Sequence, residues 1–438
     1  MSHPLEMVLL GAGNRGYYAY GPYALRYPDQ LRFVAVAEPD DAKRERFARD
    51  HGIPAERQFR SWEDVLAQPQ MAAAVLNCTM DRDHLPSALA ALDAGYDMLL
   101  EKPIASEALD CMRIVQAAER NGRLLQICHV LRYAPFFTTL ADIVRSGRLG
   151  EVISVNHNEN LSYLHMAHSF VRGNWGNAER SAPMILAKCC HDLDYLIWLM
   201  DGAPVTLSST GTTQWFRHDR VGPEIPARCL DGCPIADECG YYAPRIYLAE
   251  AVSFMVAALS SDHSYEARRR ALETSPFGRC VYRCDNTVVD HQVVSMLFGS
   301  GATVTLTMQG FSHVETRMTR IDGSRATLFA DESNNEIRIY DHYHGSGWPV
   351  HPTSKFQGKA EVIHPPLASS GHGGGDFGLM QAFVETMTQG TAPATSGRVS
   401  LESHLMAFAA EESRLNRVVV DMAEYRQRVE QAALGAVG

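Results

Sequence analysis

A glycine pattern near the N-terminus constrains the fold more than any other feature of the sequence. The apolar run 7–10 predicts a buried strand, and Gly11, Gly13 and Gly16 follow it at the spacing G-x-G-x-x-G. In such a motif the first glycine permits a tight turn, the second lets the backbone approach a pyrophosphate, and the third lets a helix pack on the strand. The chain is therefore expected to open with a dinucleotide-binding unit, with Asn14 and Arg15 in the turn.

A carboxylate follows the next apolar run at the distance this kind of unit requires. Residues 33–37 predict a second strand that ends at Glu38, about twenty residues beyond Gly16. A carboxylate at that place accepts hydrogen bonds from a ribose diol and repels a 2′-phosphate. NAD is therefore expected as the cofactor, and NADP is the less favoured alternative because Lys43 and Arg44 lie close downstream.

Length, charge and composition exclude several classes of protein. A chain of 438 residues predicts two domains, and a net charge of −11 argues against nucleic acid as a partner. No apolar stretch approaches the ~18–20 residues of a membrane span, and the N-terminus does not resemble a signal peptide. We therefore expect a cytoplasmic protein with no membrane partner. In that compartment its ten cysteines are expected to be thiols or metal ligands rather than disulfides.

The first 130 residues alternate apolar runs with helical patterns, which predicts a Rossmann-type, doubly wound parallel sheet. We predict a domain boundary at 130/131. Ligands of such sheets lie beyond the carboxyl ends of the strands. Three of those ends carry polar residues, at 77–79, 101–103 and 129–132. The predicted strands are 6–11, 32–38, 73–78, 97–101 and 124–129, and the predicted helices are 41–51, 84–94 and 106–121.

Residues 131–438 predict an α+β domain with a large, mostly antiparallel open sheet. A cysteine-bearing insertion is expected at about 213–290, and the glycine-rich segment 369–375 is expected to be a mobile loop. Ser400 is the predicted N-cap of one of two C-terminal helices within 400–432. The other predicted helices are 191–200 and 376–388, and the predicted strands are 151–159, 293–298, 303–309, 318–322, 327–330 and 336–340.

Two residues in the predicted strand-end region and the following domain are candidates for chemistry. Pro103 biases Lys102 towards extended backbone, which could aim its ammonium at the cofactor mouth; the alternative is a surface lysine. His191 begins a predicted helix beside Asp192, and such a histidine can act as an acid or base. The alternative for His191 is a histidine that caps the helix or is bonded within the core.

Two residue clusters raise the question of a metal. Cys229, Cys233 and Cys239 lie in the insertion and could bind a structural zinc ion; the alternative is that they are buried, free thiols. Their spacing is not the paired CxxC form. His165 and His168 are one helical turn apart and could form a second metal site with His191. That site is disfavoured, because such pairs arise readily in a chain with 18 histidines.

The chain resembles the Gfo/Idh/MocA oxidoreductases in four features that follow one another in sequence. They are the glycine motif, Glu38, Glu101-Lys-Pro103 and the His191 helix. The Glu-Lys-Pro tripeptide is the most specific of these features. The resemblance implies that Lys102 contacts substrate and nicotinamide, that His191 is the catalytic histidine, and that the protein is a homo-oligomer (a dimer or tetramer). It also implies that further residues line the cofactor or the substrate: Asn77, Thr79, His84, Glu101, His129 and Arg132.

One departure from the family pattern concerns the residues before His191. The family's usual aspartate four residues before the histidine is Ala187 here, and Lys188 adds a charge beside it. Simple polyol or inositol oxidation is therefore in doubt. The segment 163–175 lies where family members contact substrate, and its donors and aromatic rings suit a carbohydrate. The expected substrate contacts are Tyr163, His165, His168, Arg172, Trp175, Lys188 and His372.

These features favour hydride transfer between NAD and a secondary alcohol of a sugar or sugar derivative. His191 would remove the hydroxyl proton, and Lys102 would stabilise the oxyanion. The first alternative is a redox glycosidase that oxidises, eliminates, hydrates and re-reduces without net NADH, with Tyr163 or His165 as a second base. The second alternative is a dinucleotide-binding sensor without catalysis, which the alanine at 187 would fit.

Overall fold

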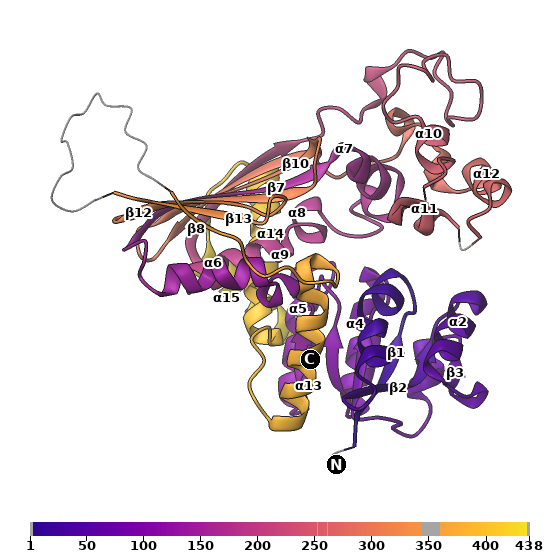
Figure 1. Ribbon diagram of the computed structural model, residues 1–438, viewed down its shortest axis with the longest axis horizontal. Coiled ribbons are helices and arrows are strands. Elements are labelled where there is room, and N and C mark those ends of the chain that lie inside the picture. Colours follow the sequence, from indigo (N-terminus) through magenta and orange to yellow (C-terminus); the bar gives the residue numbers. More distant parts are fainter. Residues whose placement is uncertain (1–2, 252, 261, 343–359, 436–438) are drawn as a thin grey trace.

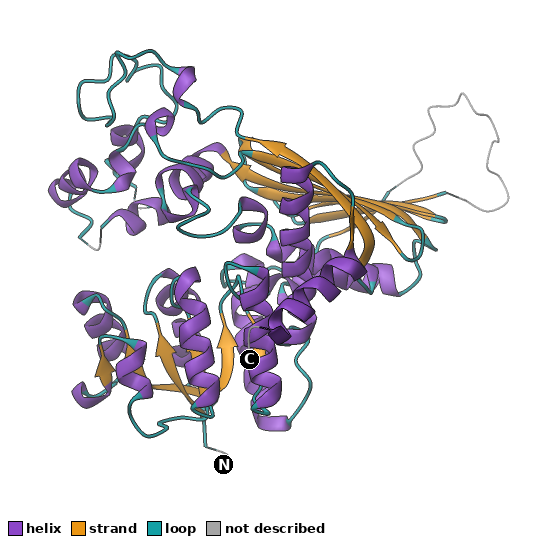
Figure 2. Ribbon diagram, turned by 180° about the vertical axis from the view of Figure 1, so that it is seen from behind, coloured by secondary structure: helices purple, strands orange, loops and turns teal. Residues whose placement is uncertain are grey.

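The protein folds around two β-sheets, seen from opposite sides in Figures 1 and 2. A computed structural model describes residues 3–251, 253–260, 262–342 and 360–435. The first sheet is parallel and six-stranded, and the second has nine strands. Both sheet types agree with the sequence prediction. In the described part of the chain, no helix is long and apolar enough to cross a membrane.

The first sheet has the strand order β3-β2-β1-β4-β5-β6, so successive strands are added to one side of β1 up to β3 and to its other side from β4 onwards. All five predicted strands form, each within two residues of the expected bounds. The sequence pattern missed β3, because a strand of two residues is too short to show an alternation of apolar and polar residues. The strands are β1 (Leu5–Leu10), β2 (Leu31–Ala37), β3 (Gln58–Phe59), β4 (Ala74–Asn77), β5 (Asp97–Leu100) and β6 (Leu125–Ile127).

Helices cover both faces of this sheet, as expected for crossover connections. The helix after the glycine motif is irregular: a π-helical segment, η1 (Asn14–Tyr20), precedes α1 (Gly21–Arg26). Asp40 caps the next helix by accepting a hydrogen bond from the Lys43 amide. The remaining helices are α2 (Asp41–His51), α3 (Trp62–Leu66), α4 (His84–Asp93) and α5 (Ala108–Arg120).

The second sheet has the order β14-β13-β12-β11-β7-β10-β9-β8-β15. Its pairs are antiparallel except β7 and β10, which run parallel. The sequence pattern missed β8, β14 and β15. The strands are β7 (Val152–Ser162), β8 (Pro204–Thr212), β9 (His291–Phe298), β10 (Thr303–Ser312), β11 (Thr316–Gly323), β12 (Ala326–Asp331), β13 (Glu336–Asp341), β14 (Glu361–Ile363) and β15 (Val420–Asp421).

The expected N-cap at Ser400 is wrong. Helix α14 (Gly397–Asn416) begins earlier, because the Ser396 hydroxyl accepts a hydrogen bond from the Val399 amide, whereas Ser400 lies buried inside the helix. The other helices are α6 (Pro135–Arg145), α7 (Tyr163–His165), η5 (Met166–Arg172), α8 (Met184–Ala187), α9 (Cys190–Met200), α13 (Gly375–Gln389) and α15 (Met422–Gly435).

The insertion lies between Thr212 at the end of β8 and His291 at the start of β9, two neighbouring strands. It contains α10 (Ala243–Tyr247), α11 (Phe254–Leu259) and α12 (Tyr265–Thr274), and lies beyond one end of the second sheet, on the side of α2 and α4 (Figure 1). Helix α13 comes from the C-terminal half of the chain. It nevertheless buries Leu379 and Phe383 in one core with Met7 and Leu9 of β1, which joins the two halves.

Candidate functional site

The glycine turn after β1 has the shape that a dinucleotide requires. Gly11 has a φ of +90°, and a Cβ there would lie 2.4 Å from the Cys78 carbonyl oxygen. A Cβ on Gly16 would lie 2.2 Å from the Gly11 carbonyl oxygen, whereas a Cβ on Gly13 would meet no described heavy atom within 4 Å. The turn is therefore closed at its first and third glycines and open at the second, where a pyrophosphate could approach the backbone.

Glu38 lies directly beside this turn. One carboxylate oxygen accepts a hydrogen bond from the Ala12 amide at 2.9 Å, and the other accepts one from the Asp40 amide at 3.1 Å. The guanidinium of Arg44 donates to the Glu38 carbonyl oxygen and pairs with Asp41. Arg44, one of the two cations expected near Glu38, is therefore already engaged, and the Glu38 side chain is buried beside the turn.

Hydrogen bonds fix the loops that follow β4 and β5. The Asn77 side-chain oxygen accepts from the backbone amide and the hydroxyl of Thr79. The His84 ring lies between two carbonyl oxygens, that of Pro103 at 2.7 Å and that of Thr79 at 3.2 Å. These residues therefore join the two strand ends that we expected to line the cofactor.

Arg15 links the glycine turn to the residues that surround Lys102 and His191. Its guanidinium pairs with Glu101, which also accepts hydrogen bonds from the Tyr20 hydroxyl and from the Lys102 amide. The same guanidinium pairs with Asp376 of α13 at 2.8 Å. Burial alone would raise the pKa of Glu101, but Arg15 and Lys102 lower it. Tyr20 and Asp376 were not predicted as site residues, since neither belongs to the strand-end motifs.

Lys102 and His191 approach each other from the two halves of the chain. The Lys102 ammonium donates a hydrogen bond to the Ala187 carbonyl oxygen at 2.9 Å, four residues before His191. His191 is the second residue of α9 and is buried, and its Nδ1 atom has no hydrogen-bond partner among the described residues. Burial, Lys102 and His129 lower the pKa of His191, so its ring is a neutral base.

Two further buried histidines, His129 and His404, lie close to His191. The His129 ring is 5.6 Å from that of His191 and 5.5 Å from that of His404, and the Nδ1 atom of His129 also has no partner in the described structure. The Nε2 atom of His404 accepts a hydrogen bond from the Ile104 amide, and Nδ1 bonds the Ser400 carbonyl oxygen. His404 therefore holds the loop that carries Lys102, from 300 residues away in sequence.

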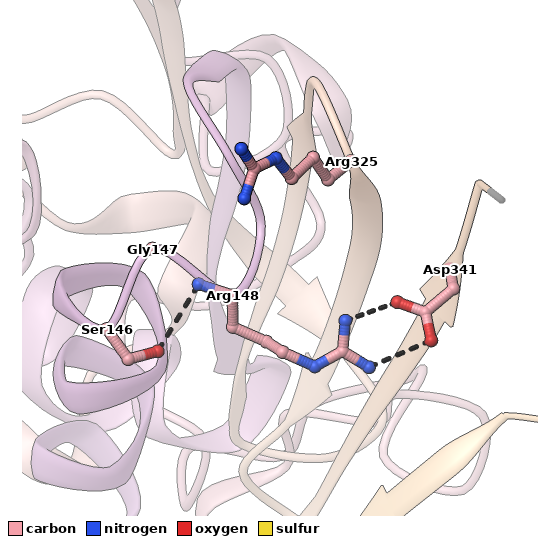
Figure 3. A pocket seen from close by; sticks show the side chains of 5 residues that line it. All are labelled: Ser146, Gly147, Arg148, Arg325 and Asp341. Atoms are coloured by element: carbon pink, nitrogen blue, oxygen red, sulfur yellow. Dashed lines mark hydrogen bonds and ion pairs between the residues drawn. The ribbon is translucent and has the colours of Figure 1, made fainter.

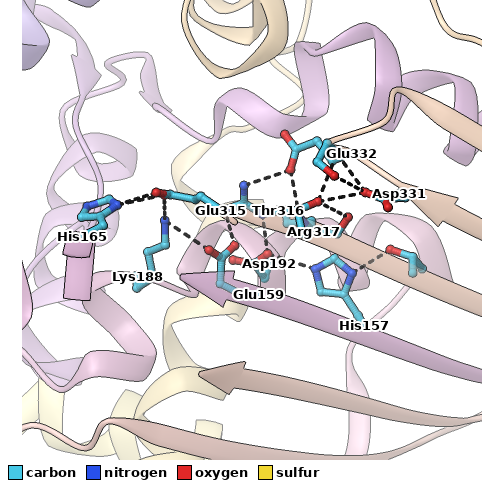
Figure 4. Close-up of polar contacts among 12 residues, drawn as sticks. His157, Glu159, His165, Lys188, Asp192, Glu315, Thr316, Arg317, Asp331 and Glu332 are labelled. Carbon is cyan, nitrogen blue, oxygen red and sulfur yellow. Dashed lines mark hydrogen bonds and ion pairs between the residues drawn. The ribbon is translucent and has the colours of Figure 1, made fainter. Parts of the chain in front are cut away.

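Lys188 belongs to a buried ionic network beneath the site, drawn in Figure 4. Its ammonium contacts Glu159 at 3.2 Å and Glu315 at 3.4 Å, and although burial would lower its pKa, these carboxylates raise it. Arg317 continues the network to Glu159 and to Asp192, both at 2.7 Å. The charge that Lys188 adds beside Ala187 is thus neutralised by neighbouring carboxylates.

The other predicted substrate contacts fall into two groups. Two lie at the edge of the site: His165 bonds Glu315 at 2.9 Å, and Tyr163 is partly exposed beside Tyr241. The others make internal contacts that position the surrounding segments. They are Arg132 bound to Asp194, His168 bound to the Tyr247 hydroxyl, Arg172 bound to the carbonyl oxygens of Arg279 and Tyr241, and Trp175 bound to Asp81.

The structure does not support the zinc site considered for the insertion. Among the described residues, no three histidine, cysteine, aspartate or glutamate side chains are grouped to hold a metal, and all ten cysteines are free. The Cys229 thiol instead contacts Arg172 and the Arg279 carbonyl oxygen. Burial raises the pKa of Cys239, which keeps that thiol protonated. Cys229 therefore acts as a small core group, whereas Cys233 and Cys239 are partly buried free thiols.

A surface hollow lies away from this site, between the end of α6 and β13 (Figure 3). It is lined by Ser146, Gly147, Arg148, Arg325 and Asp341, and Arg148 is paired with Asp341 across it. No catalytic candidate lines this hollow.

Comparison with protein-family models gives two matches. Residues 5–129 match "Oxidoreductase family, NAD-binding Rossmann fold", and residues 141–422 match "Oxidoreductase family, C-terminal alpha/beta domain". Together they cover most of the chain. The protein therefore belongs to the Gfo/Idh/MocA oxidoreductase family, which confirms the resemblance found in the sequence.

Individual relatives are distant. The chain is 23% identical to a putative oxidoreductase, YteT, of Bacillus subtilis over 69% of each chain. It is 31% identical to an inositol 2-dehydrogenase of Pseudomonas fluorescens over 52% of this chain and 72% of the relative. Levoglucosan dehydrogenase in complex with NADH and levoglucosan has the same fold, with a TM-score of 0.69, 16% identity, and coverage of 96% of this chain and 100% of that one.

The buried histidines make a prediction for acid stability. Burial lowers the pKa of both His168 and His404 to about 3, whereas an unfolded histidine has a pKa of about 6.5. Below pH 6.5 the unfolded chain therefore binds protons that the folded chain does not, and stability is lost as pH falls towards 3. At pH 5 each of these two histidines lowers the free energy of unfolding by about 2 kcal/mol.

Urea unfolding at pH 7.5 and pH 5.0 measures this loss. His404→Asn should reduce the difference between the two pH values. A difference that is the same in the wild type and in His404→Asn would contradict the assignment.

Proposed function

We propose that this protein oxidises a secondary alcohol of a sugar or sugar derivative with NAD. The observation that carries the proposal is the approach of Lys102 and His191 across the two halves of the chain, with the Lys102 ammonium bound at Ala187 and the buried His191 ring unpartnered at Nδ1 among the described residues. Buried polar atoms are normally hydrogen-bonded, so an unpaired ring atom near a lysine ammonium marks a candidate acid or base. The names of the inositol and levoglucosan dehydrogenase relatives are in keeping with a polyhydroxylated substrate.

In this reaction His191 and Lys102 have separate roles. The uncharged His191 ring accepts the hydroxyl proton as the carbon–oxygen bond becomes a carbonyl, and the Lys102 ammonium stabilises the developing oxyanion. The open glycine turn would hold the pyrophosphate, and Glu38 would accept hydrogen bonds from the ribose diol. When bound, NAD supplies hydride acceptance at the nicotinamide ring. The carboxylate of Glu38, with Arg44 already occupied, favours NAD over NADP.

Formation of NADH at 340 nm tests this function. The enzyme is mixed with NAD, or with NADP in parallel, and with myo-inositol, D-glucose or levoglucosan. We expect NADH to accumulate with at least one alcohol, and kcat/KM with NAD to exceed that with NADP at least about tenfold, since a carboxylate repels the 2′-phosphate. The absence of NADH from every alcohol in a wider sugar panel would overturn the proposal.

A second candidate, the redox glycosidase, is favoured by one contact. Both carboxylate oxygens of Glu315 lie 2.9 Å from the Nδ1 atom of His165, which orients that ring and leaves Nε2 as its basic atom. Glu315 also contacts the ammonium of Lys188 at 3.4 Å, so His165 lies at the edge of the site. His165 could therefore remove the proton next to the transient carbonyl. Release of 4-nitrophenol from nitrophenyl glycosides that needs NAD but yields no net NADH would identify this activity.

The proposal extends to location and assembly. We place the protein in the cytoplasm and infer a homo-oligomer, a dimer or tetramer. The second sheet supports self-association, because large apolar side chains on it are exposed, among them Ile153, Met318 and Phe329.

A further inference from the structure

The segment 370–376, Ser-Gly-His-Gly-Gly-Gly-Asp, carries a further imidazole into the candidate site. The ring of His372 lies 5.9 Å from the ring of His191, and its side chain is 35% exposed. His372 has a φ of +50°, a left-handed conformation that side-chain-bearing residues rarely adopt. Such strain persists only where the surrounding structure imposes it, and it gathers at functional sites.

The segment is packed tightly around the carboxylate that orients this ring. A Cβ on Gly371 would lie 2.2 Å from an Asp376 carboxylate oxygen, so only glycine leaves room there. The Nδ1 atom of His372 lies 3.0 Å from the other carboxylate oxygen. Nδ1 therefore donates its proton to Asp376, and the lone pair of the neutral ring is on Nε2. Nε2 has no hydrogen-bond partner in the described part of the chain.

Asp376 is itself held by the nucleotide-binding turn. Arg15 pairs with Asp376 at 2.8 Å and, through its Nε atom, with Glu101, whose other oxygen accepts the Lys102 amide. One guanidinium thus fixes both the orienting partner of His372 and the residue before Lys102. Burial alone would lower the pKa of His372, and Asp376 only partly opposes this, so the ring is an uncharged acceptor.

We propose that Nε2 of His372 accepts a hydrogen bond from the hydroxyl on the carbon next to the one oxidised, so that the preferred substrate is a vicinal diol. This inference rests on the proposed function, in which His191 takes the reacting hydroxyl. Two imidazoles that face one ligand, each making a hydrogen bond of roughly 2.8 Å, suit two hydroxyls on adjacent carbons. Asp376 and Arg15 are positioning residues in this arrangement.

Binding of two simple ring alcohols tests the inference without turnover. Saturation-transfer NMR on the enzyme–NADH complex compares cis-cyclohexane-1,2-diol with cyclohexanol. We expect the wild type to bind the diol about three- to tenfold more tightly, the effect of one hydrogen bond. His372→Ala should abolish this preference, and Asp376→Ala should weaken it by releasing the ring. His372→Gln, which keeps an acceptor, should restore part of it, and thermal unfolding shows whether each variant is folded.

An equal preference in wild type and His372→Ala, or no preference in either, would overturn the inference. Either result leaves the proposed function in place if NADH still forms at 340 nm. Conversely, a diol preference that depends on His372 would stand even if no alcohol in the panel were oxidised.

Discussion

We expect Lys102→Met and His191→Asn each to lower kcat for alcohol oxidation by about 10²–10⁴-fold, the usual contribution of a positioned acid or base. Both groups act on the same oxygen, one on its charge and the other on its proton. The double variant should therefore lose little more than the worse single variant. Initial rates at saturating NAD and alcohol measure the loss.

The control for this experiment is His291→Asn, a histidine outside the site whose side chain is half exposed. It should keep wild-type kcat. His191→Asn should still bind NADH, followed by its fluorescence, because the glycine turn and Glu38 are untouched. If either catalytic variant kept more than about a tenth of wild-type kcat, the assignment of that residue would be wrong.

Arg317→Met should cost about 3–5 kcal/mol of unfolding free energy, because it leaves buried carboxylates without their cation. Arg317 contacts Glu159 and Asp192, which are both buried, and Asp192 adjoins His191 (Figure 4). Burial raises the pKa of Glu159 even with Arg317 present. Without Arg317 the remaining lysine, Lys188, contacts only Glu159 of these two carboxylates.

The same strand offers a matched control. Arg320 lies three residues along β11, has a half-exposed side chain and pairs with Asp322 at the surface. Arg320→Met should change stability by less than about 1 kcal/mol. Urea unfolding monitored by circular dichroism compares the two variants, and a similar loss in both would show that the buried network is not what stabilises this region.

The sequence predicted those parts of the fold whose signals are local. The glycine spacing indicated the turn, and the helix at 41–51 has the expected bounds because Asp40 caps it and Gly52 ends it in a left-handed conformation. The pair Lys102 and His191 followed from the family resemblance. Their roles are proposed here, and the positions of both residues at the ends of predicted elements were what singled them out in the sequence.

Contacts between segments that are distant in the chain could not be predicted from the sequence. His404 holds the Lys102 loop across 300 residues, and Arg15 reaches Asp376 across 361. Neither contact has a periodic or motif signal. Ser400 looked like a cap because capping residues are common before apolar stripes, but Ser396 takes the position one turn earlier. Cys229, Cys233 and Cys239 suggested zinc because they cluster in the sequence, but the described residues contain no group of three side chains that could hold a metal.

A crystal structure with bound NAD tests the central claim most directly. The account predicts the pyrophosphate over Gly13, the ribose at Glu38, and the nicotinamide ring between the Lys102 ammonium and the His191 imidazole. A dinucleotide bound elsewhere, or a nicotinamide ring remote from both side chains, would contradict it.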